Sequence, residues 1–293
     1  MTIKLENPYD FLEIDDLLEI DDLFSDQQIN IDDDGWKNQK KDLIKLFNHE
    51  NNTIIKFSQE ERCFKKNNHS YVKGLLRSLN KIFWPTYEYT TPSYKHKKKT
   101  GLHSKREGLY RGDLVHHQLE LYINKGGFDA IKIVYDKIHP FTRKALAALN
   151  EWKLNPIISE FTIYSEILDI ATKIDLICLD EKDNIVLIEW KCGMDNYICK
   201  GNDVMQGPLK RLYSNCPLNQ AYLQLLFTKL IIEKSYQIKI KKTYVIQIHN
   251  DGIDPFKIPK RLLDQENRVF LYFENELKNQ QQQQQKHKRR KIK

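Results

Sequence analysis

The spacing of apolar residues predicts two helices followed by a group of strands in the second half of the chain. Residues 109–124 carry apolar side chains three and four positions apart, and the sequence Gly112–Asp113 suggests where this helix begins. Residues 139–153 repeat the helical spacing, and Asn155–Pro156 ends the pattern, since the residue before a proline disfavours helix.

After this point the apolar period changes from helical to alternating, which is typical of strands. The predicted elements are strand 157–165, strand 167–180, turn 181–184, strand 185–191, helix 218–234 and strand 241–249. The full order is therefore α-α-β-β-β-α-β, with hairpins and one crossover connection. This order predicts an α/β fold whose mixed central sheet is flanked by helices.

The sequence divides into four regions of different character, which are an acidic segment 1–35, a helical region 36–108, a main domain 109–277 and a tail 278–293. The acidic segment contains LEIDDL twice in succession, and it is either a flexible tail or an amphipathic helix that binds a partner protein or this protein's own basic face. The helical region includes a basic, turn-rich loop at 91–107. The tail combines six glutamines with the basic motif KHKRRK.

Charge is distributed unevenly between these regions. The 293-residue chain has a formal net charge of +7, yet the first 35 residues hold twelve acidic side chains and one lysine. The remaining chain holds 46 basic and 28 acidic side chains, a net charge of +18. Such a body suits a polyanionic partner such as DNA. A lysine-rich composition without functional meaning explains the same excess, so both interpretations stay open.

Composition narrows the class of protein. No apolar run approaches the roughly 18 residues of a membrane span, so we expect no membrane-embedded part. The five cysteines form no C-x-x-C motif, and the acidic N-terminus resembles neither a signal nor a transit peptide. We therefore expect reduced thiols and an intracellular location. The KHKRRK motif fits a nuclear-localisation signal or a nucleic-acid-binding arm.

Candidate chemistry lies in the predicted hairpin. Asp175 is in its first strand, and Glu189 and Lys191 are in its second. The hairpin can place Asp175 beside Glu189, and a strand period of two puts Glu189 and Lys191 on one face with Trp190 on the other. Two converging carboxylates suit a hard cation such as Mg²⁺, and a nearby lysine can orient water or stabilise a reacting phosphate. An ordinary charged surface strand has the same residues.

Further motifs surround this pair in a fixed order. They are Gly112–His116 (G-x-x-x-H), Glu160, Ile170–Ile177 (IATKIDLI), Ile188–Lys191 (IEWK) and Tyr222–Leu226 (YLQLL). This series resembles the PD-(D/E)xK nuclease superfamily, in particular its RecB-type and lambda-exonuclease-like branch. The stretch Asn215–Leu225 is similar to nucleases of this kind from large eukaryotic DNA viruses and mobile elements. The resemblance covers about 109–250 and implies a restriction-endonuclease-like core.

The resemblance also implies roles for the residues of the hairpin. Asp175 and Glu189 would be metal ligands, and Lys191 would be the catalytic lysine. The backbone carbonyl of Trp190 would add an oxygen ligand. Thr172 stands where the family usually has glycine.

Other residues receive roles from the flanking motifs. His116 would be an additional metal ligand, with His117 as the alternative if the helix register differs by one residue. Gln224 would contact the active-site water, the lysine or the substrate backbone, and Gln220 is the alternative one turn away. Glu160 would be an acid close to the metal.

The activity implied is a Mg²⁺-dependent deoxyribonuclease, with Mn²⁺ expected to substitute. His116 favours an exonuclease that acts on single strands or duplex ends in recombination, repair or replication. The alternatives are a structure-selective endonuclease and an inactive DNA-binding module on the same fold. Some RecB-type relatives hold an iron–sulfur cluster through one upstream cysteine and three cysteines near the C-terminal end of the domain. No cysteine follows Cys216 here, so we expect no such cluster.

Overall fold

The computed structural model describes residues 41, 44–45, 55–58, 61, 63–67, 70–84, 102–192, 204–210 and 212–292, with 102–109 and 284–292 described by their backbone alone. The acidic segment 1–35, most of the basic stretch 91–107 and Cys199 lie outside the described residues. The hypotheses that concern them remain predictions.

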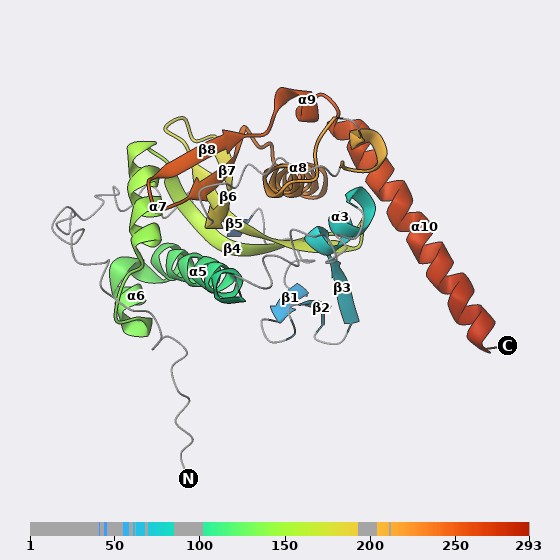
Figure 1. Cartoon of the computed structure of the whole chain (residues 1–293), viewed down its shortest axis with the longest axis horizontal. Coiled ribbons are helices and arrows are strands. Elements are labelled where there is room, and N and C mark those ends of the chain that lie inside the picture. Colours follow the sequence, from blue (N-terminus) through green and yellow to red (C-terminus); the bar gives the residue numbers. More distant parts are fainter. Residues whose placement is uncertain are drawn as a thin grey trace, which may run out of the picture.

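An eight-stranded mixed sheet forms the centre of the molecule (Figure 1). Its strands are β1 Ile55–Ser58, β2 Cys63–Lys66, β3 Ser70–Gly74, β4 Asn155–Ser165, β5 Ile170–Leu179, β6 Ile185–Cys192, β7 Lys242–Ile248 and β8 Ile253–Lys257. The strand order is β1-β2-β3-β5-β6-β7-β8, and β4 pairs with β5. The β3–β5 and β6–β7 pairs are parallel, and the other pairs are antiparallel.

Helices cover both faces of this sheet (Figure 1). They are α3 Leu75–Phe83, α5 Leu102–Leu121, α6 Gly127–Val134, α7 Pro140–Glu151, α8 Pro217–Ser235, α9 Lys260–Leu263 and α10 Glu266–Ile292, with a π-helix η1 at Tyr122–Gly126 and a 3₁₀ turn η2 at Gly207–Leu209. Helices α5 and α7 pack on one face, and α3, α8 and α10 pack on the other. The predicted α/β architecture with a mixed, helix-flanked sheet is confirmed.

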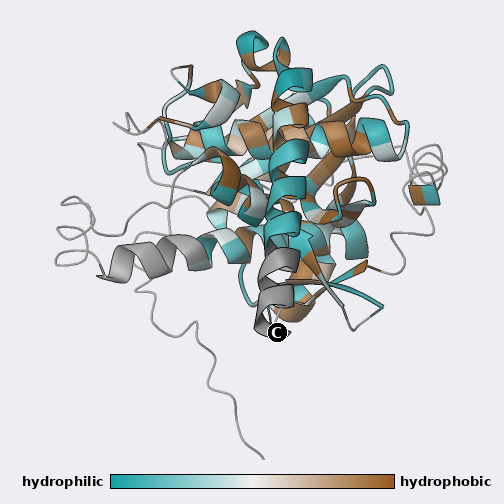
Figure 2. Ribbon diagram, turned by 90° about the vertical axis from the view of Figure 1, so that its right-hand side faces the viewer, coloured by the Kyte–Doolittle hydropathy of each residue, from teal (hydrophilic) through white to brown (hydrophobic). Residues whose placement is uncertain are grey.

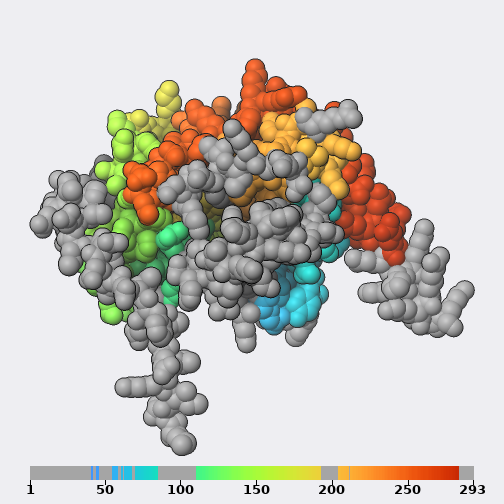
Figure 3. Space-filling view, viewed as in Figure 1, coloured from blue at the N-terminus to red at the C-terminus, as the bar shows by residue number. Residues whose placement is uncertain are grey.

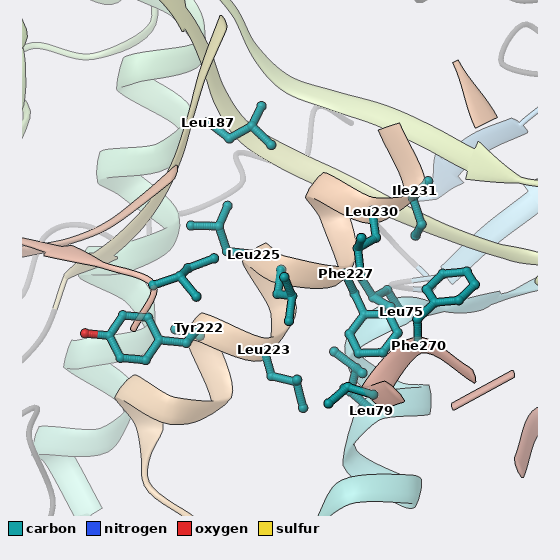
Figure 4. Close-up of a cluster of buried hydrophobic side chains, with 14 of the residues drawn as sticks. Leu75, Leu79, Leu187, Tyr222, Leu223, Leu225, Phe227, Leu230, Ile231 and Phe270 are labelled. Carbon is teal, nitrogen blue, oxygen red and sulfur yellow. The ribbon is translucent and has the colours of Figure 1, made fainter. Parts of the chain in front are cut away.

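The two faces of the sheet have separate hydrophobic cores. Leu187 of β6 packs with α8 in the larger core, whereas its neighbours Val186 and Ile188 pack with α5 and α7 in the second. Figure 4 shows the larger core around Phe227 and Leu230. Burial on both faces explains why β6 is continuously apolar in sequence, since a half-exposed strand would alternate. The hydrophobic segments in Figure 2 accordingly gather in the interior.

The predicted order of elements from 109 to 249 is confirmed, and α6 is an additional helix that the pattern did not predict. The hairpin turn is present, because the backbone N–H of Asp180 donates to the carbonyl of Asn184 at 3.0 Å. The residues from Glu166 to Asp169 form the turn between β4 and β5, so β5 begins three residues later than predicted.

The prediction of a helical region at 36–108 is wrong for residues 55–58, 63–66 and 70–74, which form β1, β2 and β3. Strands of four or five residues are too short to establish an alternating period, so the sequence did not reveal them. β3 pairs with β5 through Lys73↔Ile170 and Gly74↔Ala171, so these strands extend the main sheet. They form the lower edge of the body in Figure 3. The predicted boundary at 108 therefore does not divide the sheet.

Two other predicted boundaries are also wrong. Helix α5 begins at Leu102 instead of Gly112, so residues 102–107 of the predicted basic loop are helical. Each glycine inside a helix costs only about 1 kcal/mol, and the helix continues through Gly108 and Gly112. The tail is not separate at residue 278, since α10 runs from Glu266 to Ile292. Glutamine and lysine are good helix formers, which suits this continuation.

No helix in the described part of the chain is both long and apolar enough to cross a membrane. Cys63, Cys178, Cys192 and Cys216 are free thiols, and Cys178 and Cys216 are buried.

Candidate metal centre

The central sheet splits beside Asp175. Strands β5 and β6 pair from Leu179↔Ile185 as far as Leu176↔Ile188. Beyond this point the same edge of β5 pairs with β3, while β6 continues beside β7. The next residues in register are Asp175 and Glu189, so these two carboxylates face each other where the strands separate. We call this place the fork.

Asp175 is held in position on both sides. Its Oδ2 accepts a hydrogen bond from the backbone N–H of Trp190 at 2.8 Å. Its backbone carbonyl accepts one from Ser159 Oγ at 2.7 Å. Asn124 of the π-helix in turn binds Ser159, because its Nδ2 donates to the Ser159 carbonyl at 2.8 Å and its Oδ1 accepts from the Ser159 N–H at 3.0 Å. The side chain of Asp175 is therefore buried and fixed in one orientation.

Glu160 is in β4, opposite Asp175 of β5, between the pairs Ser159↔Leu176 and Phe161↔Ile174. Its backbone has a φ of 55°, which is unusual for a residue other than glycine. Such a conformation costs on the order of 1–3 kcal/mol and persists only where the surrounding structure enforces it. Backbone strain of this kind is often found at functional sites.

His116 completes a compact group with the two acids. Its Nδ1 lies 3.0 Å from Glu160 Oε1 and 3.7 Å from Asp175 Oδ1. One ligand atom from each of His116, Glu160 and Asp175 lies within 4.8 Å of the others. We call these three residues the His–Glu–Asp group. Two carboxylates and one imidazole suit a divalent cation that accepts oxygen and nitrogen ligands, such as Mn²⁺, or Mg²⁺ through the oxygens.

The packing of α5 determines which histidine reaches the fork. Val115 and Leu119 are fully buried in the core between α5 and the sheet. This orientation turns His116 towards the carboxylates and leaves His117 exposed, where its Nδ1 lies 2.6 Å from Tyr135 Oη. His116, and not the alternative His117, is therefore the histidine beside the acids.

Each of the two separating strands carries a lysine that pairs with one of the carboxylates. Lys191 Nζ forms an ion pair with Glu189 Oε1, and Lys173 Nζ forms one with Glu160 Oε2. The side chains of both lysines remain about a quarter exposed to solvent. The contact between Glu189 and Lys191 agrees with the prediction that they share one face of β6.

The predicted carbonyl ligand also faces the fork. In an extended strand the N–H and C=O of one residue point to the same edge. Because the N–H of Trp190 donates to Asp175, its carbonyl points to that edge too. The Trp190 side chain points the other way, into the second core. Thr172, which replaces the family's glycine, is accommodated in β5 opposite Ile163.

The acids closest to His116 in the structure differ from the pair of metal ligands expected from the sequence. Glu160, which the sequence placed beside the metal ligands, is in the His–Glu–Asp group, whereas Glu189 is paired with Lys191. Gln224 is half-buried on α8, and the side chain of the alternative, Gln220, donates to Asn215 Oδ1 at 2.7 Å. The proposed contacts of either glutamine with water, lysine or substrate stay a prediction.

Electrostatics couple the members of this group. Burial and the nearby Glu189 carboxylate raise the pKa of Asp175 above its ordinary value. Burial alone would lower the pKa of His116, but the carboxylates of Asp175 and Glu160 outweigh it and raise the pKa to about 9. Burial would raise the pKa of Glu160, yet His116 and Lys173 lower it. Strongly perturbed pKa values that share one cluster are typical of functional sites.

Three residues at the fork were missed by the sequence analysis. Lys173 had a usable signal, since it lies two positions before Asp175 in a strand and must share its face. Ser159 and Asn124 had none, because their role depends on a π-helix that local sequence does not specify. Comparisons with known proteins found neither a protein-family model nor a curated protein that matches this chain.

Metal binding at the His–Glu–Asp group should depend on pH. A cation must displace the proton that His116 carries below its pKa of about 9, and Asp175 must also be ionised. We expect the affinity for Mn²⁺ to rise up to about tenfold per pH unit from about pH 7 and to level off near pH 9. Calorimetric titration of the DNA-free protein would measure this. His116→Gln should bind more weakly with a shallower pH dependence, and a pH-independent wild type would contradict histidine ligation.

Proposed function

We propose that this protein is a metal-dependent deoxyribonuclease built on a restriction-endonuclease-like core. One observation carries the proposal: His116, Glu160 and Asp175 converge at a fork of the sheet where the next strand supplies Glu189 and Lys191. Buried carboxylates that face one another across separating strands are costly to fold, because each like charge destabilises the other. A bound cation would offset that cost.

The residues divide the chemistry between them. Asp175, Glu160 and His116 would hold a divalent cation. The Trp190 carbonyl points to the same edge of β6 as the N–H that binds Asp175, and Glu189 lies close enough to raise the pKa of Asp175. When bound, the cation supplies Lewis-acid stabilisation of the charge that develops on a phosphodiester under attack. The Lys191 ammonium can donate hydrogen bonds to an attacking water or to a phosphate oxygen. Its ion pair with Glu189 fixes the ammonium at the fork.

DNA is the substrate that the charge distribution favours. The chain after residue 35 has a net charge of +18, and phosphate contacts supply most of the affinity in binding without sequence preference. The histidine in the G-x-x-x-H motif favours an exonuclease, on the resemblance to the lambda-exonuclease-like branch. We therefore propose that the protein degrades DNA from ends, in recombination, repair or replication.

End-labelled linear DNA tests this proposal. Purified protein should release labelled products from single-stranded or duplex DNA with Mg²⁺ or Mn²⁺ and should be inactive in EDTA. Lys191→Ala should lose at least about a hundredfold in rate, since one electrostatic donor is typically worth that much. Lys153→Ala is a matched control, because Lys153 also pairs with an acid, Glu181, but is 67% exposed at a remote turn.

Circular DNA separates the candidate activities. An exonuclease should leave a closed circle intact, whereas cleavage of the circle would favour the structure-selective endonuclease. Binding without cleavage under every metal condition would favour the inactive DNA-binding module. Undiminished cleavage by Lys191→Ala would overturn the proposed site.

A further inference from the structure

Lys173 and Lys191 hold equivalent positions on the two strands of the fork. The pairs Leu176↔Ile188 and Ile177↔Leu187 define the register of β5 and β6. Continued past the fork, this register sets Asp175 opposite Glu189 and Lys173 opposite Lys191. Each strand thus carries an acid and a lysine two residues apart, and side chains two apart in a strand share one face. Both lysines therefore lie further along the separating strands than the two acids.

Contacts hold the Lys173 ammonium close to the His–Glu–Asp group. Its Nζ pairs with Glu160 Oε2 and lies 5.3 Å from the centre of the Phe57 ring of β1. A cation over an aromatic face is stabilised by the ring's electron density. About a quarter of the side chain remains exposed, so an anion in solution can reach it.

The sum of charges at the fork with a bound cation indicates a role for a second lysine. Glu160, Asp175 and Glu189 contribute three negative charges at the fork. A divalent cation and two lysines contribute four positive charges, which leaves one excess positive charge. A phosphodiester carries one negative charge and matches that excess, whereas a fork with Lys191 alone would already be neutral.

We propose that Lys173 is a second phosphate-binding lysine, which moves from Glu160 to a phosphodiester of the bound strand when a cation occupies the His–Glu–Asp group. The inference rests on the proposed nuclease function and deepens it. It assigns the substrate strand a path between β5 and β6, with one lysine on either side.

Three variants test the assignment: Lys173→Met, Lys173→Arg and the control Lys242→Met. Lys242 lies at the far end of β7, where it pairs with Asp180, so its variant has the same change of charge away from the fork. Affinity for a labelled oligonucleotide is measured by fluorescence anisotropy with Ca²⁺ over a range of salt concentrations. Cleavage with Mg²⁺ and Mn²⁺ binding without DNA are measured in parallel.

We expect Lys173→Met to bind DNA about tenfold more weakly and to reduce the slope of log affinity against log salt by about one. Cleavage should fall at least as much. Mn²⁺ affinity should be maintained or increased, because a neighbouring positive charge has been removed. Lys173→Arg should restore most of the DNA affinity, and Lys242→Met should change neither the affinity nor the slope beyond about twofold.

Other outcomes would overturn the inference. If Lys173→Met loses Mn²⁺ affinity and keeps the wild-type salt slope, Lys173 only positions Glu160. If it binds and cleaves DNA like the wild type, the inference fails while the nuclease function stands. If the wild-type protein neither binds nor cleaves DNA, the proposed function fails and this inference fails with it.

Discussion

Asp175→Asn should abolish DNA cleavage, with a fall in rate on the order of a thousandfold, which corresponds to about 4 kcal/mol of transition-state stabilisation. Asparagine has the shape of aspartate, and its Oδ1 can still accept the hydrogen bond from the Trp190 N–H. The substitution therefore removes the charge that a cation needs while preserving the geometry of the fork. Mn²⁺ binding should weaken in parallel with activity.

The same variant should be more stable than the wild type above neutral pH. Burial and Glu189 raise the pKa of Asp175, so folding disfavours its ionised form. The cost appears as pH rises above the unfolded pKa and is complete above the folded pKa. Asparagine cannot ionise, and we expect a gain of at least about 1 kcal/mol near pH 8. The gain should shrink towards about pH 4, where the carboxyl is protonated in both states.

A control separates this effect from a general change of charge. Asp183 lies in the exposed turn between β5 and β6 with a φ of 57°, a conformation that asparagine also tolerates. Asp183→Asn should leave cleavage unchanged and stability within about 0.5 kcal/mol of the wild type. If Asp175→Asn loses both activity and stability, Asp175 has a structural role instead.

The fork was partly predictable from the sequence. Asp175, Glu189 and Lys191 stand out because charged side chains interrupt strands that are mostly apolar. Sequence periodicity then gives their shared face, and the hairpin gives their register. The partner across β4 was less certain, because Glu160 owes its position to a strained backbone and a bulged strand that periodicity does not encode.

Features that depend on distant parts of the chain were not predictable in the same way. β1, β2 and β3 join the sheet through the parallel pairing of β3 with β5, and their short sequences do not indicate that pairing. The orientation of His116 follows from the burial of Val115 and Leu119, which a helical pattern allows but does not fix against His117. Local sequence predicted the helices, strands and candidate site residues of the main domain. Tertiary contacts determined where the elements end and which residues meet at the fork.

Phe227→Ala should produce the largest loss of stability among substitutions away from the fork, about 3–5 kcal/mol. Phe227 is fully buried on α8, and its ring centre lies 4.5 Å from that of Phe273 on α10 and 6.0 Å from that of Phe83 on α3. One side chain thus joins three helices over the sheet face that includes Leu187 (Figure 4). Its removal leaves a cavity that these helices cannot fill without moving.

Urea unfolding followed by tryptophan fluorescence would measure the loss. Because a domain is typically stable by only about 5–15 kcal/mol, the variant should unfold at a much lower urea concentration. Leu271→Ala is the matched control, since Leu271 is on α10 but 57% exposed, and it should cost less than about 0.5 kcal/mol. If α10 is integral to the main domain, both variants should unfold in one transition. A cost below about 1 kcal/mol for Phe227→Ala, or a separate early transition for α10, would mean that this helix does not share the core of the sheet.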